Sequence, residues 1–289
     1  MPIPMKMKVE SSGFHTYKRL EGKVAIITGG ASGFGETTAA LFARHGAKVV
    51  IADVQDDRGH ALCGRIGLPE KVTYVHCDVT RDDDVRSAVD LAVSKYGGLD
   101  IMFNNAGIPG NLDFAIADAD GDNFKRVFDV NVYGAFLGAK HAARAMIPAR
   151  RGGVILFTAS VASVVAGESP HSYAASKHAV VGLMKNLCVE LGKHGIRVNA
   201  ISPCAVATPL LTGTMGVGKE VVEDIICASA NLKGVVPTAD DVAEAALYLG
   251  SDESKFVSGL NLVVDGGYST TNQSYTRVIN TVFSPKSVP

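Results

Sequence analysis

The segment KVAIITGGASGFGETTAALFARHG, residues 23–46, decides the fold class because it joins a strand, a glycine-rich turn and a helix. Its first seven residues are a short β-branched run, which predicts a buried strand. Gly29, Gly33 and Gly35 permit a tight turn, and the helix after it presents free N–H groups suited to a pyrophosphate. Such a turn alone also fits the plain start of a helix. Its place between a first strand and a first helix favours nucleotide binding.

Short apolar runs alternate with longer amphipathic stretches along the rest of the chain. Strands are expected within 48–54, 71–79, 99–107, 152–160, 196–203 and 259–267. Helices are expected at 57–66, 82–97, 122–148, 171–195 and 238–251, the last capped by Thr238. Strict alternation with continuously apolar strands predicts an α/β protein whose parallel sheet is covered on both faces, with right-handed crossovers.

No repeat or low-complexity stretch divides this pattern, so one domain is expected. Its boundaries are a tail at 1–20, the domain at 21–275 and a second tail at 276–289. Residues 208–237 are the exception, because 210–237 mix Gly, Thr and apolar residues without a clear period. Such a segment late in an α/β chain is a candidate lid over a substrate site.

Composition excludes several classes of partner. The net charge is −1 and no long Lys/Arg run occurs, so neither nucleic acid nor an anionic membrane is an expected partner. The five cysteines contain no CxxC pair, which argues against a metal site or disulfides and for reduced thiols in the cytoplasm. The N-terminus lacks an apolar core, and no apolar run approaches the roughly 18 residues that a membrane span needs.

The segment SYAASKHAVVGL, residues 172–183, predicts a helix with Tyr173 and Lys177 on one face. Tyr173 follows Ser160 by thirteen residues. An ammonium beside a phenol favours the phenolate and lowers the tyrosine pKa. A tyrosine tuned in this way exchanges a proton with an alcohol or ketone. By itself the YxxxK pair is more often a solvated helix pair, and Ser163 is a rival for the serine.

Polar side chains also mark the ends of the predicted strands. Asp53 can accept hydrogen bonds from a ribose diol and repel a 2′-phosphate, although it could simply cap the next helix. Asp78 could bind an adenine amino group or have only a structural role. Asn131, a mediocre helix former inside a predicted helix, could equally be a satisfied buried amide. The loop 203–209 could contact a carboxamide.

The order of these motifs along the chain resembles that of the short-chain dehydrogenase/reductase family. The motifs are TGxxxGxG, an acidic strand end, NNAG at 104–107, a helix asparagine, Ser with YxxxK and a Pro…Thr loop. The resemblance covers about residues 20–270 and is strongest to a plant branch that includes secoisolariciresinol, xanthoxin and borneol dehydrogenases. It implies a single-domain, Rossmann-type, doubly wound parallel sheet of about seven strands with helices on both faces. It also implies NAD as cofactor and a homotetramer.

The family's roles transfer residue by residue. The resemblance makes Tyr173 the acid/base, Lys177 the residue that binds the nicotinamide ribose, Ser160 the holder of the substrate oxygen and Asn131 the support of a water chain. The implied cofactor-binding residues are Gly29, Ser32, Gly33, Phe34, Gly35, Asp53, Val54, Asp78, Val79, Asn105, Ala106, Gly107, Tyr173, Lys177, Pro203, Val206 and Thr208. Two positions depart from the pattern: Phe34 replaces isoleucine, and Cys204 replaces glycine.

The expected reaction is hydride transfer between NAD and a hydrophobic secondary alcohol or ketone. A small terpenoid or a lignan-like plant specialised metabolite is the expected substrate, because 210–218 is apolar and the resemblance is to the plant branch. One alternative is a non-oxidative terpenoid cyclase or isomerase on the same NAD-binding scaffold, which Phe34 keeps open. A non-catalytic binding protein is the other alternative, and the intact Ser160, Tyr173 and Lys177 argue against it.

Overall fold

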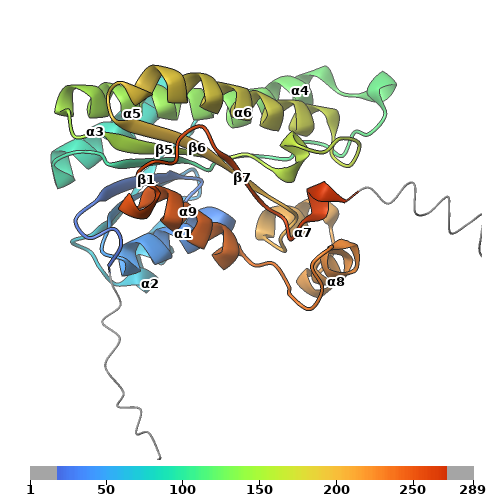
Figure 1. Cartoon of the computed structure of the whole chain (residues 1–289). Coiled ribbons are helices and arrows are strands. Elements are labelled where there is room, and N and C mark those ends of the chain that lie inside the picture. Colours follow the sequence, from blue (N-terminus) through green and yellow to red (C-terminus); the bar gives the residue numbers. More distant parts are fainter. Residues whose placement is uncertain (1–17, 272–289) are drawn as a thin grey trace, which may run out of the picture.

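The computed structural model describes residues 18–271, so most of both predicted tails lies outside the described residues. One sheet of seven parallel strands, in the order β3-β2-β1-β4-β5-β6-β7, forms the centre (Figure 1). The strands are β1 (Val24–Thr28), β2 (Lys48–Asp53), β3 (Val72–His76), β4 (Ile101–Asn104), β5 (Gly153–Thr158), β6 (Ile196–Pro203) and β7 (Asn261–Val264). This confirms the predicted fold class.

Helices cover both faces of the sheet. They are α1 (Gly33–Arg44), α2 (Asp56–Ile66), α3 (Asp82–Tyr96), α4 (Gly121–Phe128), α5 (Gly134–Ala149), α6 (His171–Gly192), α7 (Pro209–Met215), α8 (Lys219–Ser229) and α9 (Ala239–Gly250). In Figure 1, α3, α5 and α6 lie on one side of the strands and α1, α2 and α9 on the other. The predicted Thr238 cap is confirmed as a capping box with Asp241.

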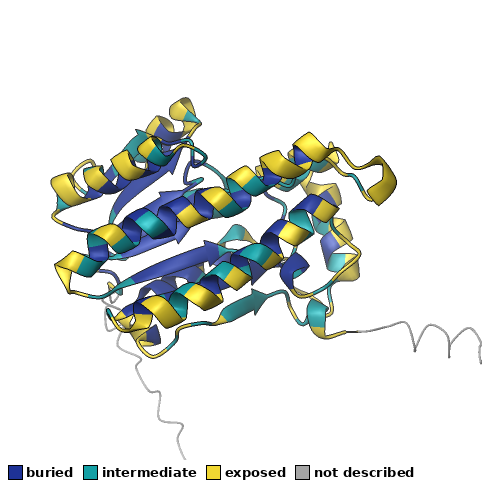
Figure 2. Ribbon diagram, turned by 90° about the horizontal axis from the view of Figure 1, so that it is seen from above, coloured by how far each residue is buried: buried dark blue, intermediate teal, exposed yellow. Residues whose placement is uncertain are grey.

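Alternate residues along the strands pack into two separate hydrophobic cores. Val24 and Ile26 of β1 pack with residues of α3, α5 and α6, whereas Ala25 and Ile27 pack with residues of α1 and α9. Both faces of the central strands are therefore buried, as the dark ribbons of Figure 2 show. This two-sided burial is the reason for the continuous apolar strand sequences.

Close contact between α5 and the sheet depends on Gly138. A Cβ built at this position would lie 1.8 Å from Oδ1 of Asn104, the last residue of β4. No side chain other than hydrogen fits there. The helix is thus held directly against the strand end from which the loop at 105–115 departs.

The helix predicted at 122–148 is interrupted by a π-helical turn. The turn, η2, spans Asp129–Tyr133 and joins α4 to α5 without breaking the helical path. It contains Asn131, which is buried. Single π-turns inside helices are frequent at functional sites because they re-aim side chains.

The region 208–237, predicted as a loop without clear period, contains two short helices. Thr208 caps α7 by accepting a hydrogen bond from Leu211 N, and Gly216 ends it with φ of 66°. Figure 1 shows α7 and α8 projecting beside the C-terminal end of the sheet. Leu210, Met215 and Ile225 are exposed on these helices. The segment therefore offers apolar side chains at the strand edge where ligands bind in such folds.

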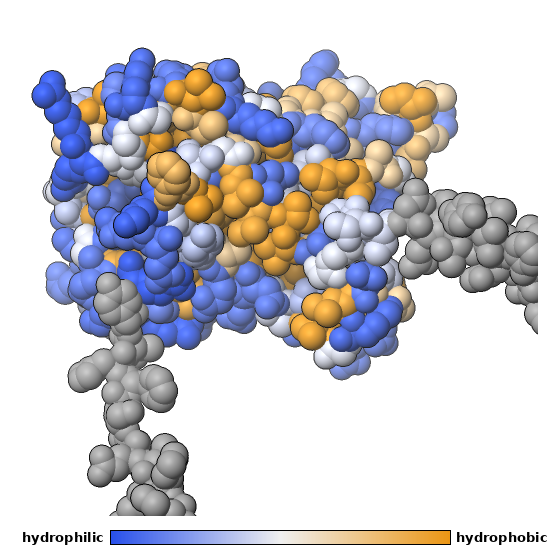
Figure 3. Space-filling model, in the orientation of Figure 1, coloured by the Kyte–Doolittle hydropathy of each residue, from blue (hydrophilic) through white to orange (hydrophobic). Residues whose placement is uncertain are grey.

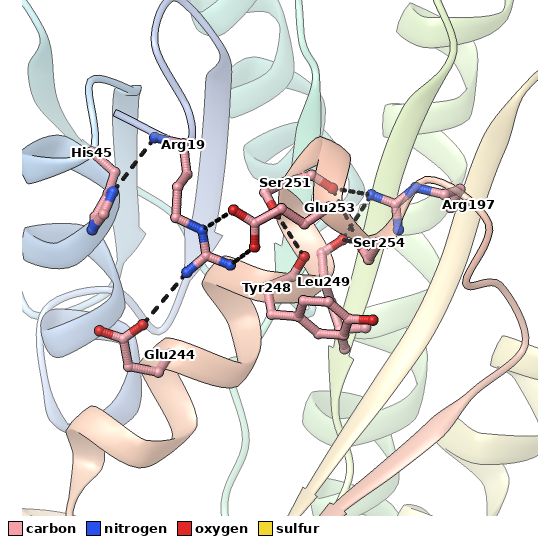
Figure 4. Close-up of polar contacts among 9 residues, drawn as sticks. All are labelled: Arg19, His45, Arg197, Glu244, Tyr248, Leu249, Ser251, Glu253 and Ser254. Atoms are coloured by element: carbon pink, nitrogen blue, oxygen red, sulfur yellow. Dashed lines mark hydrogen bonds and ion pairs between the residues drawn. The ribbon is translucent and has the colours of Figure 1, made fainter. Parts of the chain in front are cut away.

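Arg19 joins the segment before β1 to the C-terminal part of the fold (Figure 4). Its guanidinium donates two hydrogen bonds to Glu253, one of them from Nε at 2.8 Å, and lies 3.7 Å from Glu244 on α9. Arg197 of β6 donates to the carbonyls of Leu249 and Ser251 at the end of the same helix.

Within residues 18–271, no helix is long and apolar enough to cross a membrane.

Candidate active site

The glycine-rich turn forms a cradle that side chains would fill. Gly29 has φ of 60°, and a Cβ at Gly35 would lie 2.2 Å from the Gly29 carbonyl oxygen. Asn105 closes the back of the turn, because its Nδ2 donates to the carbonyls of Thr28 and Gly29 at 3.0 and 3.2 Å. The Ala106 amide donates to Oγ1 of Thr28. This leaves the helix N-terminus beyond the turn open to an anion.

Asp53, the last residue of β2, faces this turn. Its side chain is only 4% exposed, and it accepts hydrogen bonds from the amides of Ala31 at 2.9 Å and Gln55 at 3.0 Å. Val54, beside it, is exposed and brings no charge. A carboxylate at this strand end suits a ribose diol and disfavours a phosphate there.

The other predicted cofactor residues divide into two groups. Pro203 ends β6, Val206 is buried, and Thr208 approaches the cradle, with its Cβ 3.6 Å from where a Cβ of Gly33 would lie. Asp78 instead accepts hydrogen bonds from the amide and the hydroxyl of Thr80, which is a structural role. Among the remaining residues, Ser32 is the N-cap of α1, whereas Phe34 and Val79 pack against the two cores.

Lys177 lies at the centre of the predicted catalytic group. Its Nζ donates to the Thr158 carbonyl at 2.8 Å and lies 5.4 Å from the centre of the Tyr173 ring. A Cβ at Gly107 would lie 3.3 Å from the same Nζ and 3.2 Å from Oδ1 of Asn131. The structure therefore brings these residues, from four separate elements, to one place beside the cradle.

Asn131 links this group to the loop after β4. Its Nδ2 donates to the Ile108 carbonyl at 2.9 Å and to Oγ of Ser176 at 3.0 Å, while its Oδ1 accepts from the Ile108 amide at 2.8 Å. Ser176 in turn donates to the Tyr173 carbonyl. The satisfied buried amide is thus the role that the structure shows for this side chain. Ser176 was missed, although it directly precedes Lys177.

Thr158 is the second residue that the sequence did not reveal. Its carbonyl accepts from Lys177 and its hydroxyl donates to Oδ1 of Asn105 at 3.0 Å. A chain of hydrogen bonds therefore runs from the lysine to the glycine-rich turn. The position of Thr158 two residues before Ser160, at a strand end, was the only available signal.

Burial controls the electrostatics of the pair. It lowers the pKa of Lys177, which is 3% exposed, to about 8. Burial also raises the pKa of Tyr173, and a hydrogen bond from Ser160 acts in the opposite direction. The expectation that the ammonium lowers the tyrosine pKa is therefore not met by the protein alone, because desolvation outweighs the neighbouring groups.

The two candidate serines have different surroundings. Oγ of Ser160 accepts a hydrogen bond from the Ala162 amide at 3.1 Å and lowers the pKa of Tyr173, whereas the hydroxyl of Ser163 lies 3.1 Å from that of Ser202 on β6. His171 contacts the Phe114 carbonyl, and His178 contacts the Ala174 carbonyl of its own helix. Neither histidine contacts Tyr173 or Lys177 among these hydrogen bonds.

The cradle and Asp53 fit a dinucleotide with a free ribose diol. Three glycines bring the backbone of the turn close to where a pyrophosphate would approach, and Asp53 at the end of β2 presents a carboxylate to the Ala31 amide of the same turn. Gly107 leaves room beside Lys177, where a Cβ would crowd the ammonium. These residues suit NAD in particular.

Known proteins share this architecture along most of the chain. A family model described as enoyl-(acyl carrier protein) reductase matches residues 29–269. Short chain aldehyde dehydrogenase 1 of Euphorbia lathyris is 59% identical over 93% of this chain and 96% of its own. Secoisolariciresinol dehydrogenase of Forsythia intermedia is 57% identical (88% and 92%), and (+)-borneol dehydrogenase 1 of Salvia officinalis is 54% identical (88% and 96%).

A solved structure gives the same result. The 3-ketoacyl-(acyl-carrier-protein) reductase of Brucella melitensis complexed with NADH is 38% identical, with a TM-score of 0.78 over 86% of this chain and 99% of that one. The chain is an oxidoreductase that uses NAD, and nothing in these comparisons favours the cyclase alternative. With the family model and these relatives covering most of its length, the chain belongs to the short-chain dehydrogenase/reductase family.

Proposed function

We propose that Tyr173, Lys177, Ser160 and Asn131 are the catalytic residues of this dehydrogenase, and that its substrate is a hydrophobic secondary alcohol or the matching ketone. The observation that carries the proposal is the position of Lys177 between Tyr173, Asn131 and Gly107, beside the glycine-rich cradle. We also propose that the named cofactor-binding residues hold NAD, with less support for Asp78 because Thr80 already donates to its carboxylate.

Each side chain has one task in the oxidative direction. Ser160 donates a hydrogen bond to the substrate oxygen, and Tyr173 as phenolate takes the hydroxyl proton. NAD, held by the glycine-rich cradle and Asp53, would supply the hydride acceptor and a positive charge that favours the phenolate. Lys177 adds further positive charge near the phenol, and Asn131 holds the loop at Ile108 against the site.

The proposed substrate class is a small terpenoid or lignan-like alcohol. Two relatives carry borneol and secoisolariciresinol in their names, which are compounds of these classes. The exposed apolar side chains of α7 and α8 would suit such a compound. A panel of monoterpenoid and lignan alcohols with NAD, followed by the absorbance of reduced nicotinamide, tests the proposal. Activity only on small polar alcohols would contradict it.

Substrate ranking should change when the α7 segment is altered. Leu210→Asn or Met215→Asn should change the ratio of kcat/KM between two alcohols by tens of fold, because an apolar contact in a pocket is worth about 1–3 kcal/mol. NAD affinity should stay nearly constant. Leu68→Asn, an exposed leucine beyond α2, is the matched control. An unchanged ranking would place the pocket around 108–114 and 161–170.

Cofactor preference should follow Asp53. NAD should bind at least tenfold more tightly than NADP, about 1.4 kcal/mol, because the carboxylate repels a 2′-phosphate. Asp53→Asn should reduce this ratio, whereas Asp90→Asn on the exposed face of α3 should not. Titration calorimetry with both oxidised cofactors measures the ratio, and equal affinities in the wild type would contradict the role of Asp53.

A homotetramer is proposed as the functional assembly. Stacked aromatic pairs lie along α4, η2 and α5, with Phe124 against Phe128 at 4.8 Å and Tyr133 against Phe136 at 6.2 Å, and all but Phe128 are exposed. The edge strand β7 is only partly covered, and hydrophobic side chains gather around it in Figure 3. Large apolar surfaces of this kind suit obligate oligomers. Light scattering at micromolar concentration should find four subunits, and a monomer would contradict this.

The cytoplasm is the proposed location, and 21–275 the proposed domain. All five cysteines lie within the described residues and are free, which suits a reducing compartment. Cell fractionation tests the location, and recovery of the protein in an organelle would contradict it.

A further inference from the structure

We propose that Ser163, Ser202 and Asn261 form a positioning ring that holds Ser160 in its working orientation. The inference rests on the catalytic role proposed above for Ser160. It gives a task to the serine that the sequence offered as a rival, and it adds two residues, on β6 and β7, to those on which the reaction depends.

The ring joins three elements. Ser163 ends the 3₁₀ turn η3 (Val161–Ser163), Ser202 lies on β6, and Asn261 begins β7. The hydroxyl oxygens of the two serines are 3.1 Å apart, Ser202 donates to Oδ1 of Asn261 at 2.7 Å, and Nδ2 of Asn261 donates to Ser163 at 3.4 Å. Both serines are buried.

The donors run in one direction around the ring. Ser202 uses its only proton toward Asn261, and Asn261 donates an N–H to Ser163. The proton shared by the two serines must therefore come from Ser163. Each member donates once and accepts once, and a closed chain of this kind strengthens its own bonds in a buried setting.

The ring fixes the turn that starts at Ser160. The Ser163 amide donates to the Ser160 carbonyl at 2.8 Å, and the Ala162 amide donates to Oγ of Ser160 at 3.1 Å. On the other side, the Ala159 amide donates to the Ile201 carbonyl at 2.7 Å. Ser160 thus lies between two attachments to β6, and one of them passes through the ring.

A purely structural role would be redundant. The strands β6 and β7 are already joined by their backbone ladder, in which Ser202 pairs with Val263. What the ring adds is a side-chain link from these strands to η3. Since Ser160 begins this turn and its hydroxyl lowers the pKa of Tyr173, a loosened turn should weaken that effect.

A double-mutant cycle in the full-length enzyme tests the ring. Ser163→Ala should lower kcat roughly tenfold, the effect of one lost or misdirected hydrogen bond, with NAD affinity unchanged. The acidic limb of the kcat pH profile for alcohol oxidation should move to higher pH, because the Ser160 contact lowers the pKa of Tyr173. In a Ser160→Ala background, Ser163→Ala should add nothing, since both act through one hydroxyl.

One further variant tests a second member of the ring, and another serves as a control. Ser202→Ala breaks the ring at another member and should give the same loss and the same shift. Ser254→Ala removes a buried serine hydroxyl whose hydrogen bonds go to the carbonyls of Leu249 and Ser251 (Figure 4), and should leave kcat and the pH profile unchanged.

The outcomes separate the ring from the proposed function. If Ser160→Ala lowers kcat but Ser163→Ala and Ser202→Ala leave kcat and its pH profile unchanged, the proposed positioning role of the ring is overturned. The proposed role of Ser160 then stands. Additive losses in the double variant also overturn it. If Ser160→Ala itself turns over normally, the proposed role of Ser160 fails and the ring fails with it.

Discussion

Tyr173→Phe should lower turnover by roughly 10²–10⁴-fold, because it removes the group that accepts the substrate proton. Only the hydroxyl is lost, so the aromatic side chain at 173 keeps its packing contacts and the neighbouring Lys177 keeps its hydrogen bond to Thr158. Affinity for NAD should remain within a few-fold of the wild type, since the cradle at Gly29–Gly35 is untouched. Steady-state kinetics with the best alcohol of the panel, together with calorimetry of NAD binding, measure both quantities.

Tyr248→Phe is the matched control for this change. Tyr248 lies on α9, which covers the opposite face of the sheet from the α6 helix of Tyr173 (Figure 1), and its loss of a hydroxyl should leave turnover unchanged. A Tyr173→Phe enzyme with near-normal turnover would mean that another group moves the proton.

Lys177→Met should stabilise the cofactor-free protein by about 3 kcal/mol at pH 7. The reason is the cost of burying the ammonium, which lowers its pKa from an ordinary value of 10.5 to about 8. Each pKa unit corresponds to about 1.4 kcal/mol, and the loss of the Thr158 hydrogen bond reduces the gain somewhat. The same variant should lose activity, so stability and activity change in opposite directions.

The difference in the free energy of unfolding between Lys177→Met and the wild type should become smaller as the pH rises. Below pH 8 both folded and unfolded chains hold the proton, and the full cost applies. Between pH 8 and 10.5 the folded chain releases it first, so the wild type regains stability relative to Lys177→Met. Buried thiols such as Cys77, whose pKa rises to about 12, act in the opposite direction but are common to both proteins.

Urea unfolding at pH 7 and pH 9.5 measures the difference between the two proteins. Lys185→Met, an exposed lysine on the same helix, should show no such change with pH. A constant difference between wild type and Lys177→Met across this range would contradict the burial argument.

The sequence predicted the fold class because both sides of each strand are apolar, a pattern that only a doubly covered sheet requires. It did not predict the π-turn at Asn131, since the surrounding residues follow an ordinary helical pattern. Residues 208–237 were predicted as irregular, yet α7 and α8 form there. Their helices are short and half-exposed, so the apolar period is weak.

The site shows the same division. The residues proposed to be catalytic could be picked out from the sequence because their types and order are distinctive. Ser176 and Thr158 were missed because ordinary polar residues acquire meaning only from their neighbours in space. The direction of the Tyr173 pKa was also wrong for the protein alone, because the spacing of Tyr173 and Lys177 reveals proximity but not the depth of burial.

The order of the strands has a consequence for synthesis on the ribosome. Along the sheet, β5, β6 and β7 each lie next to the strand that precedes them in the chain. Because the chain emerges N-terminus first, every later strand meets a partner that has already left the exit tunnel. From β4 onward the sheet therefore grows at one edge only, while β3 stays the strand at the other edge. Ser160, Tyr173 and Lys177 emerge before β7, so the nascent enzyme carries its chemical groups before its scaffold is complete.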